Sequence, residues 1–395
     1  MRIPSYIFAV PLLVMSGFVH AEFSGVVSAE LRHYSETALD TRQQDEGISI
    51  FAEPEFYYEW SDGRQSLTIT PFGRWDSEDQ DRSHFDMREL SWLYIADAWE
   101  LRIGLSKVFW GVSESQHLVD VVNQTDLVEN PDGEDKLGQP MIHLTWLPNW
   151  GTIDAFLLPY FRERTFPGVE GRLRPGLIID EDGARYQAGA EEKHMDAALR
   201  WSWTYDIWDV GLSHFYGTQR DPRFVVEGTP QNGLVLIPVY DLMHQTGLDV
   251  QATLDAWLLK LEAIHRISRQ DVFNALTAGF EYTLYGIFET AIDLGLIAEY
   301  LHDSRGREAD TPFQDDTMLG LRFAFNDVRD SEILGGVIID NDHSGEAYSL
   351  EARTRLSDHW TIDVEARVFS NMDEQNGLYS FRRDDFVQLV LAYHF

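Results

Sequence analysis

The feature that most constrains the fold is a period of two in hydrophobicity. Between residues 48 and 60 every second residue is apolar or aromatic, and most residues between them are polar or acidic. The same period recurs over 99–105, 196–204, 348–356 and 360–368. Successive side chains of a β-strand point to opposite faces, so this pattern predicts strands with one apolar and one polar face. We therefore expect an all-β protein.

The first residues are typical of a secretory signal. Arg2 gives a positive start, residues 6–18 are mostly apolar, and Val19-His20-Ala21 fits a cleavage site before Glu22. We expect a signal peptide over 1–21 and a single domain over 22–395. No later stretch approaches the ~20 apolar residues of a membrane-spanning helix. Two interpretations therefore remain open: a soluble exported protein, such as a β-sandwich, and a transmembrane β-barrel.

Composition narrows these alternatives. The chain has no cysteine, which excludes disulfides, thiolate catalysis and thiolate-bound metal. Its formal net charge of −35 argues against a nucleic-acid partner, because such binding needs a basic face. The 12 Trp, 16 Tyr and 23 Phe favour a membrane barrel, in which aromatic residues gather at both interfaces.

The spacing of strands and loops favours the barrel further. Short connections alternate with long ones along most of the chain, as in transmembrane barrels with short periplasmic turns and long external loops. We predict an antiparallel up-and-down barrel of about 18 strands, with 16 also compatible. The predicted strands cover 22–34, 46–60, 65–76, 83–95, 99–112, 139–148, 151–161, 193–205, 207–218, 242–254, 256–268, 271–284, 287–301, 315–326, 331–341, 345–357, 359–371 and 384–395.

The C-terminus carries a resemblance to a known family. Val387, Leu389, Leu391, Tyr393 and Phe395 form one apolar face that ends on an aromatic residue. This resembles the last strand of bacterial outer-membrane barrels, rather than an edge strand that merely ends on Phe. The resemblance implies the outer membrane of a Gram-negative bacterium, with lipid and lipopolysaccharide around the barrel and assembly machinery that recognises Phe395. An apolar exterior is compatible with a homotrimer as well as a monomer.

The alternation stops between Lys107 and Met141, where seven acidic residues collect. This stretch follows the fifth predicted strand and forms the third external loop. In that position it resembles the third loop of general and sugar-specific porins, which folds inward and narrows the pore; residues 109–115 also resemble a W-G-x-S pattern of some outer-membrane barrels. We expect residues 113–138 to form a constriction, with a short helix over 114–124 begun by a Ser113/Gln116 capping box. The alternative is a solvated acidic external loop. The candidate constriction residues are Glu114, Asp120, Asn123, Asp126 and Glu129.

The parity of the strands directs charged residues of both signs into the lumen. We also expect the arginines of the 162–192 loop to face the acidic loop, which would create a transverse field. The alternative is that lumen charges pair across strands and stiffen the wall. The basic lumen candidates are Arg74, Arg102, Arg200, Arg322, Arg353, Arg355 and Arg367.

The function expected from this pattern is a passive diffusion channel for small hydrophilic, charged or dipolar solutes, without catalysis, cofactor or metal. The net charge predicts cation selectivity. The acidic loop does not meet the EF-hand pattern. Two alternatives are a non-transport barrel for adhesion or envelope structure, and a barrel hydrolase with a nucleophile and a histidine at the outer rim. His302-Asp303-Ser304 and His343-Ser344 are the sequences closest to such a site, but adjacent strand residues point to opposite faces.

Overall fold

The structure is a computed structural model that describes residues 20–229, 233–309 and 311–395. It confirms the all-β prediction and the number of eighteen wall strands. Most of the expected signal peptide (1–21) lies outside the described residues, and His20 and Ala21 begin the first strand. The wall strands are β1 (His20–Tyr34), β2 (Glu46–Trp60), β3 (Gln65–Asp76), β4 (Phe85–Ile95), β5 (Trp99–Ser106), β6 (Gln139–Trp146), β7 (Thr152–Leu158), β10 (Asp196–Tyr205), β11 (Trp208–Thr218), β14 (Leu242–Leu254), β15 (Trp257–Ser268), β16 (Val272–Leu284), β17 (Asp293–Asp303), β18 (Asp315–Ala324), β19 (Glu332–Asp340), β20 (Glu346–Ser357), β21 (Trp360–Ser370) and β22 (Phe386–His394).

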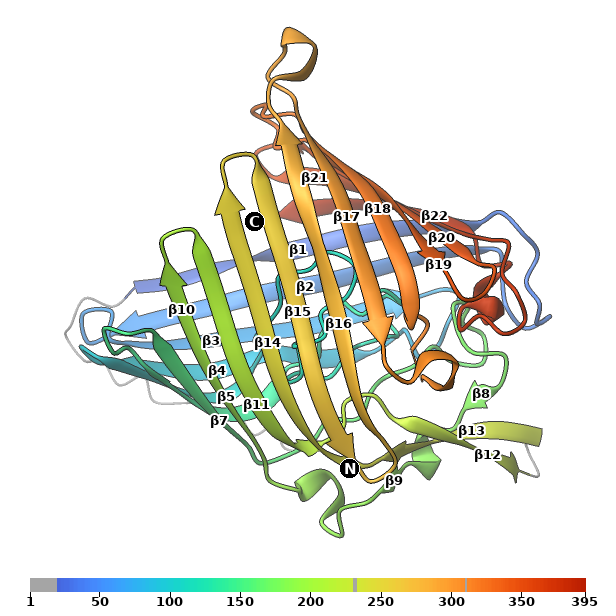
Figure 1. Cartoon of the computed structure of the whole chain (residues 1–395), viewed down its shortest axis with the longest axis horizontal. Coiled ribbons are helices and arrows are strands. Elements are labelled where there is room, and N and C mark those ends of the chain that lie inside the picture. Colours follow the sequence, from blue (N-terminus) through green and yellow to red (C-terminus); the bar gives the residue numbers. More distant parts are fainter. Residues whose placement is uncertain (1–19, 230–232, 310) are drawn as a thin grey trace, which may run out of the picture.

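The sheet closes on itself into a barrel (Figure 1). Each wall strand pairs antiparallel with its chain neighbour, and β1 pairs antiparallel with β22. Beyond the last strand, Gly25 and Phe395 exchange both backbone hydrogen bonds at 3.1 Å, and the rings of Phe23 and Phe395 lie 5.4 Å apart. The C-terminal aromatic therefore lies at the seam, and the closed sheet leaves no unpaired wall edge.

The two ends of the barrel differ in their connections. At one end the turns are tight: Asp206 and Asp255 have φ values of 54° and 50°, a left-handed conformation that suits two-residue hairpins and that Asp tolerates. We call this the short-turn end. The other end carries the long connections and is called the long-loop end. Both described termini of the wall, at β1 and β22, lie at the short-turn end.

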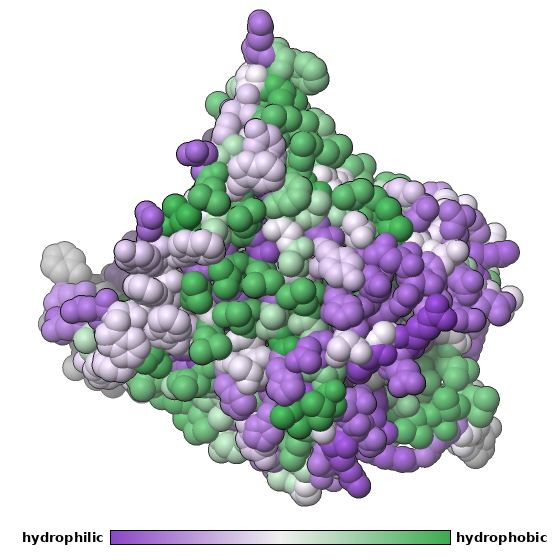
Figure 2. Space-filling view, viewed as in Figure 1, coloured by the Kyte–Doolittle hydropathy of each residue, from purple (hydrophilic) through white to green (hydrophobic). Residues whose placement is uncertain are grey.

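The outer face of the wall is apolar. Leu212, Trp257, Leu319 and Leu350 point away from the lumen with exposed fractions of 48, 44, 46 and 43%. Figure 2 shows hydrophobic side chains gathered over the strands and hydrophilic ones over the loops. Within the described residues, no helix is long and apolar enough to span a membrane.

A second, smaller sheet lies at the long-loop end and was not predicted. It contains β8 (Ile178–Ile179), β9 (Arg185–Tyr186), β12 (Arg223–Thr229) and β13 (Gly233–Tyr240). The strands β12 and β13 form an antiparallel pair in the loop between β11 and β14. Since β13 also pairs parallel with β8 and β9, which lie in the loop between β7 and β10, the sheet joins these two long loops. The helical elements of the described chain are single 3₁₀ turns, namely η1 (Glu181–Gly183), η2 (Glu191–Lys193), η3 (Ile287–Glu289), η4 (Gly306–Glu308) and η5 (Tyr379–Phe381).

Candidate functional site

Residues 107–138, between β5 and β6, form the candidate site and are called the inward loop. Their path lies inside the barrel (Figure 1) and contacts opposite parts of the wall: Glu129 binds Arg74 on β3, while the backbone of Val112 binds Glu262 on β15. The expected helix over 114–124 is wrong, since these residues form bends and turns. Several backbone N–H groups of this segment donate to carboxylates of the wall, whereas in a helix they would donate to backbone carbonyls of the preceding turn.

An apolar core on one side of the lumen packs against the inward loop. We call the side that carries it the apolar half: it comprises the lumen faces of β6, β7, β10, β11, β14, β15 and β16, which also hold the Arg200–Asp249 pair and Glu262. Trp110, Val119 and Val122 of the loop are at most 5% exposed, and the rings of Trp110 and Phe156 lie 5.6 Å apart. Burying each large side chain contributes about 1.5–3 kcal/mol. The wall residues of this core are Met141, Phe156, Leu158, Ala198, Phe215, Met243, Ile264, Phe273 and Ala275.

Two buried carboxylates of the wall hold the backbone of the inward loop. Glu262 on β15 accepts N–H groups of Val112 and Ser113 at 2.7 and 2.9 Å, and of Val119 at 3.2 Å. Glu299 on β17 accepts the N–H groups of Glu114 and Ser115 at 2.8 and 2.9 Å. Hydrogen bonds to a charged group are worth about 1.5–3 kcal/mol. These two glutamates hold residues 112–119 of the inward loop against β15 and β17.

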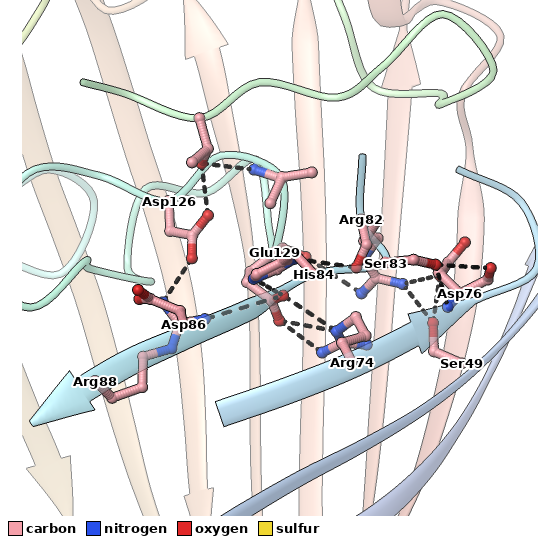
Figure 3. A network of polar contacts seen from close by, with 12 residues as sticks. Ser49, Arg74, Asp76, Arg82, Ser83, His84, Asp86, Arg88, Asp126 and Glu129 are labelled. Carbon is pink, nitrogen blue, oxygen red and sulfur yellow. Dashed lines mark hydrogen bonds and ion pairs between the residues drawn. The ribbon is translucent and has the colours of Figure 1, made fainter. Parts of the chain in front are cut away.

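On the opposite wall, arginines of β3 and β4 hold two loop carboxylates (Figure 3). Asp126 accepts Nη1 of Arg88 at 2.6 Å, and Glu129 accepts Nη2 of Arg74 at 2.7 Å. Buried charges need such paired, hydrogen-bonded partners. His84 places a ring nitrogen near these carboxylates at a spacing compatible with a metal ion. The guanidinium groups already occupy the carboxylate oxygens, so the cluster fits an ion-pair network.

The closed barrel and the loop inside it identify the fold. The chain has a porin-like β-barrel fold. Its eighteen strands form a closed antiparallel barrel, and its third long loop contacts opposite sides of the lumen.

The candidate constriction residues divide into two groups. Asp120, Asn123 and Asp126 have buried side chains, 0–1% exposed, and point into the loop and its wall contacts rather than into open space. Asn123 donates to the carbonyls of Ser106 and Leu137, and Asp120 pairs with Lys136 at 3.3 Å. Glu129 is held by Arg74. Of the five, Glu114 borders open space.

That open space is a cavity of about 680 Å³ between the tip of the inward loop and the wall, and is called the lumen cavity. The tip contributes Ser113–Ser115, His117, Asn130, Asp132, Glu134 and Asp135. The wall contributes residues of β18–β22, whose lumen faces we call the charged half. Eight carboxylates line the cavity, against three guanidinium groups and His117. Asp132, Glu134 and Asp135 were not among the candidate residues, although they belong to the same acidic stretch.

The basic lumen candidates also divide. Arg322 contacts Glu114 of the loop at 2.7 Å, and Arg367 contacts Asp132 at 3.2 Å; Arg74 holds Glu129, as above. The others pair with carboxylates outside the inward loop: Arg102 with Glu89 at 2.9 Å, Arg200 with Asp249 at 2.7 Å, Arg353 with Asp363 at 3.4 Å and Arg355 with Asp330 at 2.5 Å. The acidic loop of this porin-like barrel thus faces arginines of the wall.

The arginines of the 162–192 loop do not provide the expected opposing charge. Arg172 is fully buried and donates to Asp384 and Asp45, both at 2.9 Å. Arg174 pairs with Asp40 at 3.0 Å. These carboxylates belong to other long loops, so the arginines fasten the long-loop end together. The inward loop meets this layer through Thr165, which donates to Asp126 at 2.5 Å. Arg162 and Arg164 also contact the inward loop, since they donate to the Gly138 carbonyl at 2.9 Å and to the Gln124 side chain at 3.2 Å.

Comparisons with known proteins add little to this description. No protein-family model matches the chain, and no curated protein matches it. Solved structures of similar shape include a triple mutant of Rhodopseudomonas blastica porin (10% identity, 95% of this chain and 100% of that chain covered, TM-score 0.46). Another is OmpT, an outer membrane protein of Vibrio cholerae in trimer form (10% identity, 95% and 99% covered, TM-score 0.46). These likenesses are too distant to bear on function.

The surroundings of the loop tip shift its protonation. Burial lowers the pKa of His117, but Glu134 at 3.0 Å and Glu262 outweigh this effect and raise it to about 10. Loss of hydration raises the pKa of Asp132 to about 7 and that of Asp135 to about 6. At neutral pH His117 is therefore a cation, while Asp132 and Asp135 titrate near neutrality.

Proposed function

We propose that the protein is a passive diffusion channel in the outer membrane of a Gram-negative bacterium, for small hydrophilic solutes that are charged or dipolar. The observation that carries this proposal is the lumen cavity, left open beside the inward loop within a closed barrel. A barrel of this size has room for an aqueous path, and a loop inside it would set the width and charge of that path. The apolar outer face supports a membrane location.

The proposed partners follow from the same surface. Lipid and lipopolysaccharide would cover the apolar outer face, and assembly machinery would recognise the last strand with Phe395 at the seam. A homotrimer would cover part of that face.

We propose no catalytic step. His302 stacks on Tyr300 at 6.3 Å on the outer face of β17, while Asp303 is buried and holds Arg305 at 2.8 Å. Their opposite directions argue against a catalytic dyad at this rim.

Conductance of single channels in a planar bilayer tests the proposal. The full chain should conduct, and deletion of 114–137 should raise the conductance, because it removes the inward loop from the lumen. Absence of conductance for the full chain with every solute would refute the channel. Unchanged conductance after the deletion would refute the constriction.

A milder variant tests the attachment of the loop without exposing the apolar half. Glu262→Gln with Glu299→Gln keeps the shape of both side chains but weakens five backbone hydrogen bonds to the loop. We expect larger and noisier conductance, because the tip gains freedom. Glu55→Gln is the matched control, since it removes a lumen carboxylate of β2 opposite Ser24 of β1.

A further inference from the structure

The lumen cavity has a surplus of negative charge that its own arginines do not neutralise. Arg367 is shared by Asp132, Glu351 and Glu365, at 3.2, 2.8 and 2.9 Å. Arg322 is likewise shared by Glu114, Glu332 and Glu281. Among the described residues, the carboxylate of Asp135 has no hydrogen bond or ion pair. A surplus of carboxylates in a walled space raises the local concentration of cations.

A second observation at the loop tip indicates a missing polar partner. Ser113 is only 5% exposed and lines the lumen cavity. Its hydroxyl has no hydrogen-bond partner within the described part of the chain, and neither has Oδ1 of the neighbouring Asn130. A buried hydroxyl without a partner costs free energy. Both oxygens are buried, so a side-chain rotation must bring either one to the cavity surface before it can accept a hydrogen bond from a solute.

The wall of the cavity adds an apolar strip between its charges. Met318, Leu334 and Ile338 pack together on the lumen side of β18 and β19. Leu334 lies between Arg322 on β18 and Glu351 on β20 in the strand register. A solute with a charged head and a short aliphatic chain can therefore contact a carboxylate and the strip together.

We propose that the lumen cavity contains a binding subsite for a small organic cation, an ammonium or guanidinium group that carries a short aliphatic chain. The head binds the surplus carboxylates and the oxygens of Ser113 and Asn130, and the chain lies on the strip of Met318, Leu334 and Ile338. The volume of about 680 Å³ admits such a solute together with water. This subsite rests on the proposed channel function, because the solute enters with the flow through the lumen.

The test uses the full chain in a planar bilayer in KCl, with methylammonium, butylammonium or butyrate added on one side. We expect butylammonium to reduce the potassium current at a concentration about tenfold below that of methylammonium, because each buried methylene adds affinity. Butyrate, with a similar chain and the opposite charge, should not reduce it. Block by butyrate equal to that by butylammonium overturns the cation subsite. Equal block by the two cations overturns the role of the strip.

Two variants locate the subsite. Asp135→Asn should weaken block by both cations about fivefold through the lost attraction, and Leu334→Asn should remove the advantage of butylammonium over methylammonium. The control is Asp358→Asn, which removes one charge at the short-turn end, outside the cavity. Block that is equal in wild type and both variants overturns the proposal. A chain that does not conduct refutes the channel, whereas a chain that conducts without block by either cation refutes the subsite alone.

Discussion

The apolar half and the charged half of the barrel interior come from the same kind of strand but are built differently. In the apolar half, Phe156, Phe215 and Met243 meet Val119 and Trp110 of the inward loop in an apolar core. In the charged half, the lumen faces of β18–β22 keep arginines and carboxylates around an open cavity. A single barrel thus contains a packed interior on one side and an open cavity on the other.

This difference shows how the inward loop can be firmly held and still line an open cavity. Its apolar residues and buried carboxylates are used for attachment, on the sides of β3–β4 and β6–β16. Its remaining acidic residues, Glu114, Asp132, Glu134 and Asp135, face the cavity. Mutations in the two halves should therefore affect different properties.

The largest effect is expected in the apolar half. Phe215→Ala removes a fully buried ring and should lower the free energy of unfolding by about 3–5 kcal/mol, through lost burial and the cavity left behind. Unfolding in urea of the protein folded into lipid vesicles measures this. Glu351→Gln is the comparison in the charged half, where the side chain is 49% exposed and the expected loss is below about 1 kcal/mol. Equal losses of unfolding free energy in the two variants would contradict the difference in packing between the two halves.

An intermediate effect is expected from pH, in the charged half. The pKa of Asp132 is raised to about 7 and that of Asp135 to about 6, so both are charged at pH 8 and neutral at pH 5. The cation preference, read from the reversal potential in a KCl gradient, should fall as pH falls through this window. Asp132→Asn should remove the upper part of the change. A reversal potential independent of pH, or one that favours anions at pH 8, would contradict this account.

The smallest effect is expected outside both halves. Arg355 pairs with Asp330 at the short-turn end, and the side chains are 48 and 69% exposed. Because exposed ion pairs contribute little, Arg355→Gln should change the free energy of unfolding by less than about 0.5 kcal/mol and leave the conductance unchanged. Arg367→Gln, which removes the cation shared by three carboxylates, is the contrasting variant and should alter cation block.

The barrel was predictable because the pattern recurs in many strands, although it is weak in some, such as β7 and β19. The bounds of β2 and β3, 46–60 and 65–76, are confirmed to the residue. The predicted strand over 99–112 was too long, because β5 ends at Ser106 and the chain then turns into the lumen. A loop that packs inside the barrel keeps apolar residues, so its sequence resembles a continuation of the strand. The strands β8, β9, β12 and β13 were missed because they lie in loops, where no division between lipid and lumen imposes a period.

The site was predictable in position but not in detail. The place of the third loop in the chain predicts the end of the barrel at which it begins, and its entry into the lumen was expected only from the resemblance to porins, but the helix over 114–124 does not form. The Ser113 N–H, which the Gln116 side chain would accept in a capping box, instead donates to Glu262, 149 residues away. One sequence signal of the inward packing was available: the lumen positions of Met141, Phe156 and Phe215 are apolar, which a fully aqueous lumen would not favour.

The apolar half also has a consequence for the order of assembly. A wall that closed with an empty interior would expose Phe156, Leu158, Phe215 and Phe273 to water. Entry of residues 107–138 buries these side chains, and their strands, β6 to β16, all precede the closing strand β22 in the chain. Docking of the loop is therefore coupled energetically to assembly of the strands that surround it.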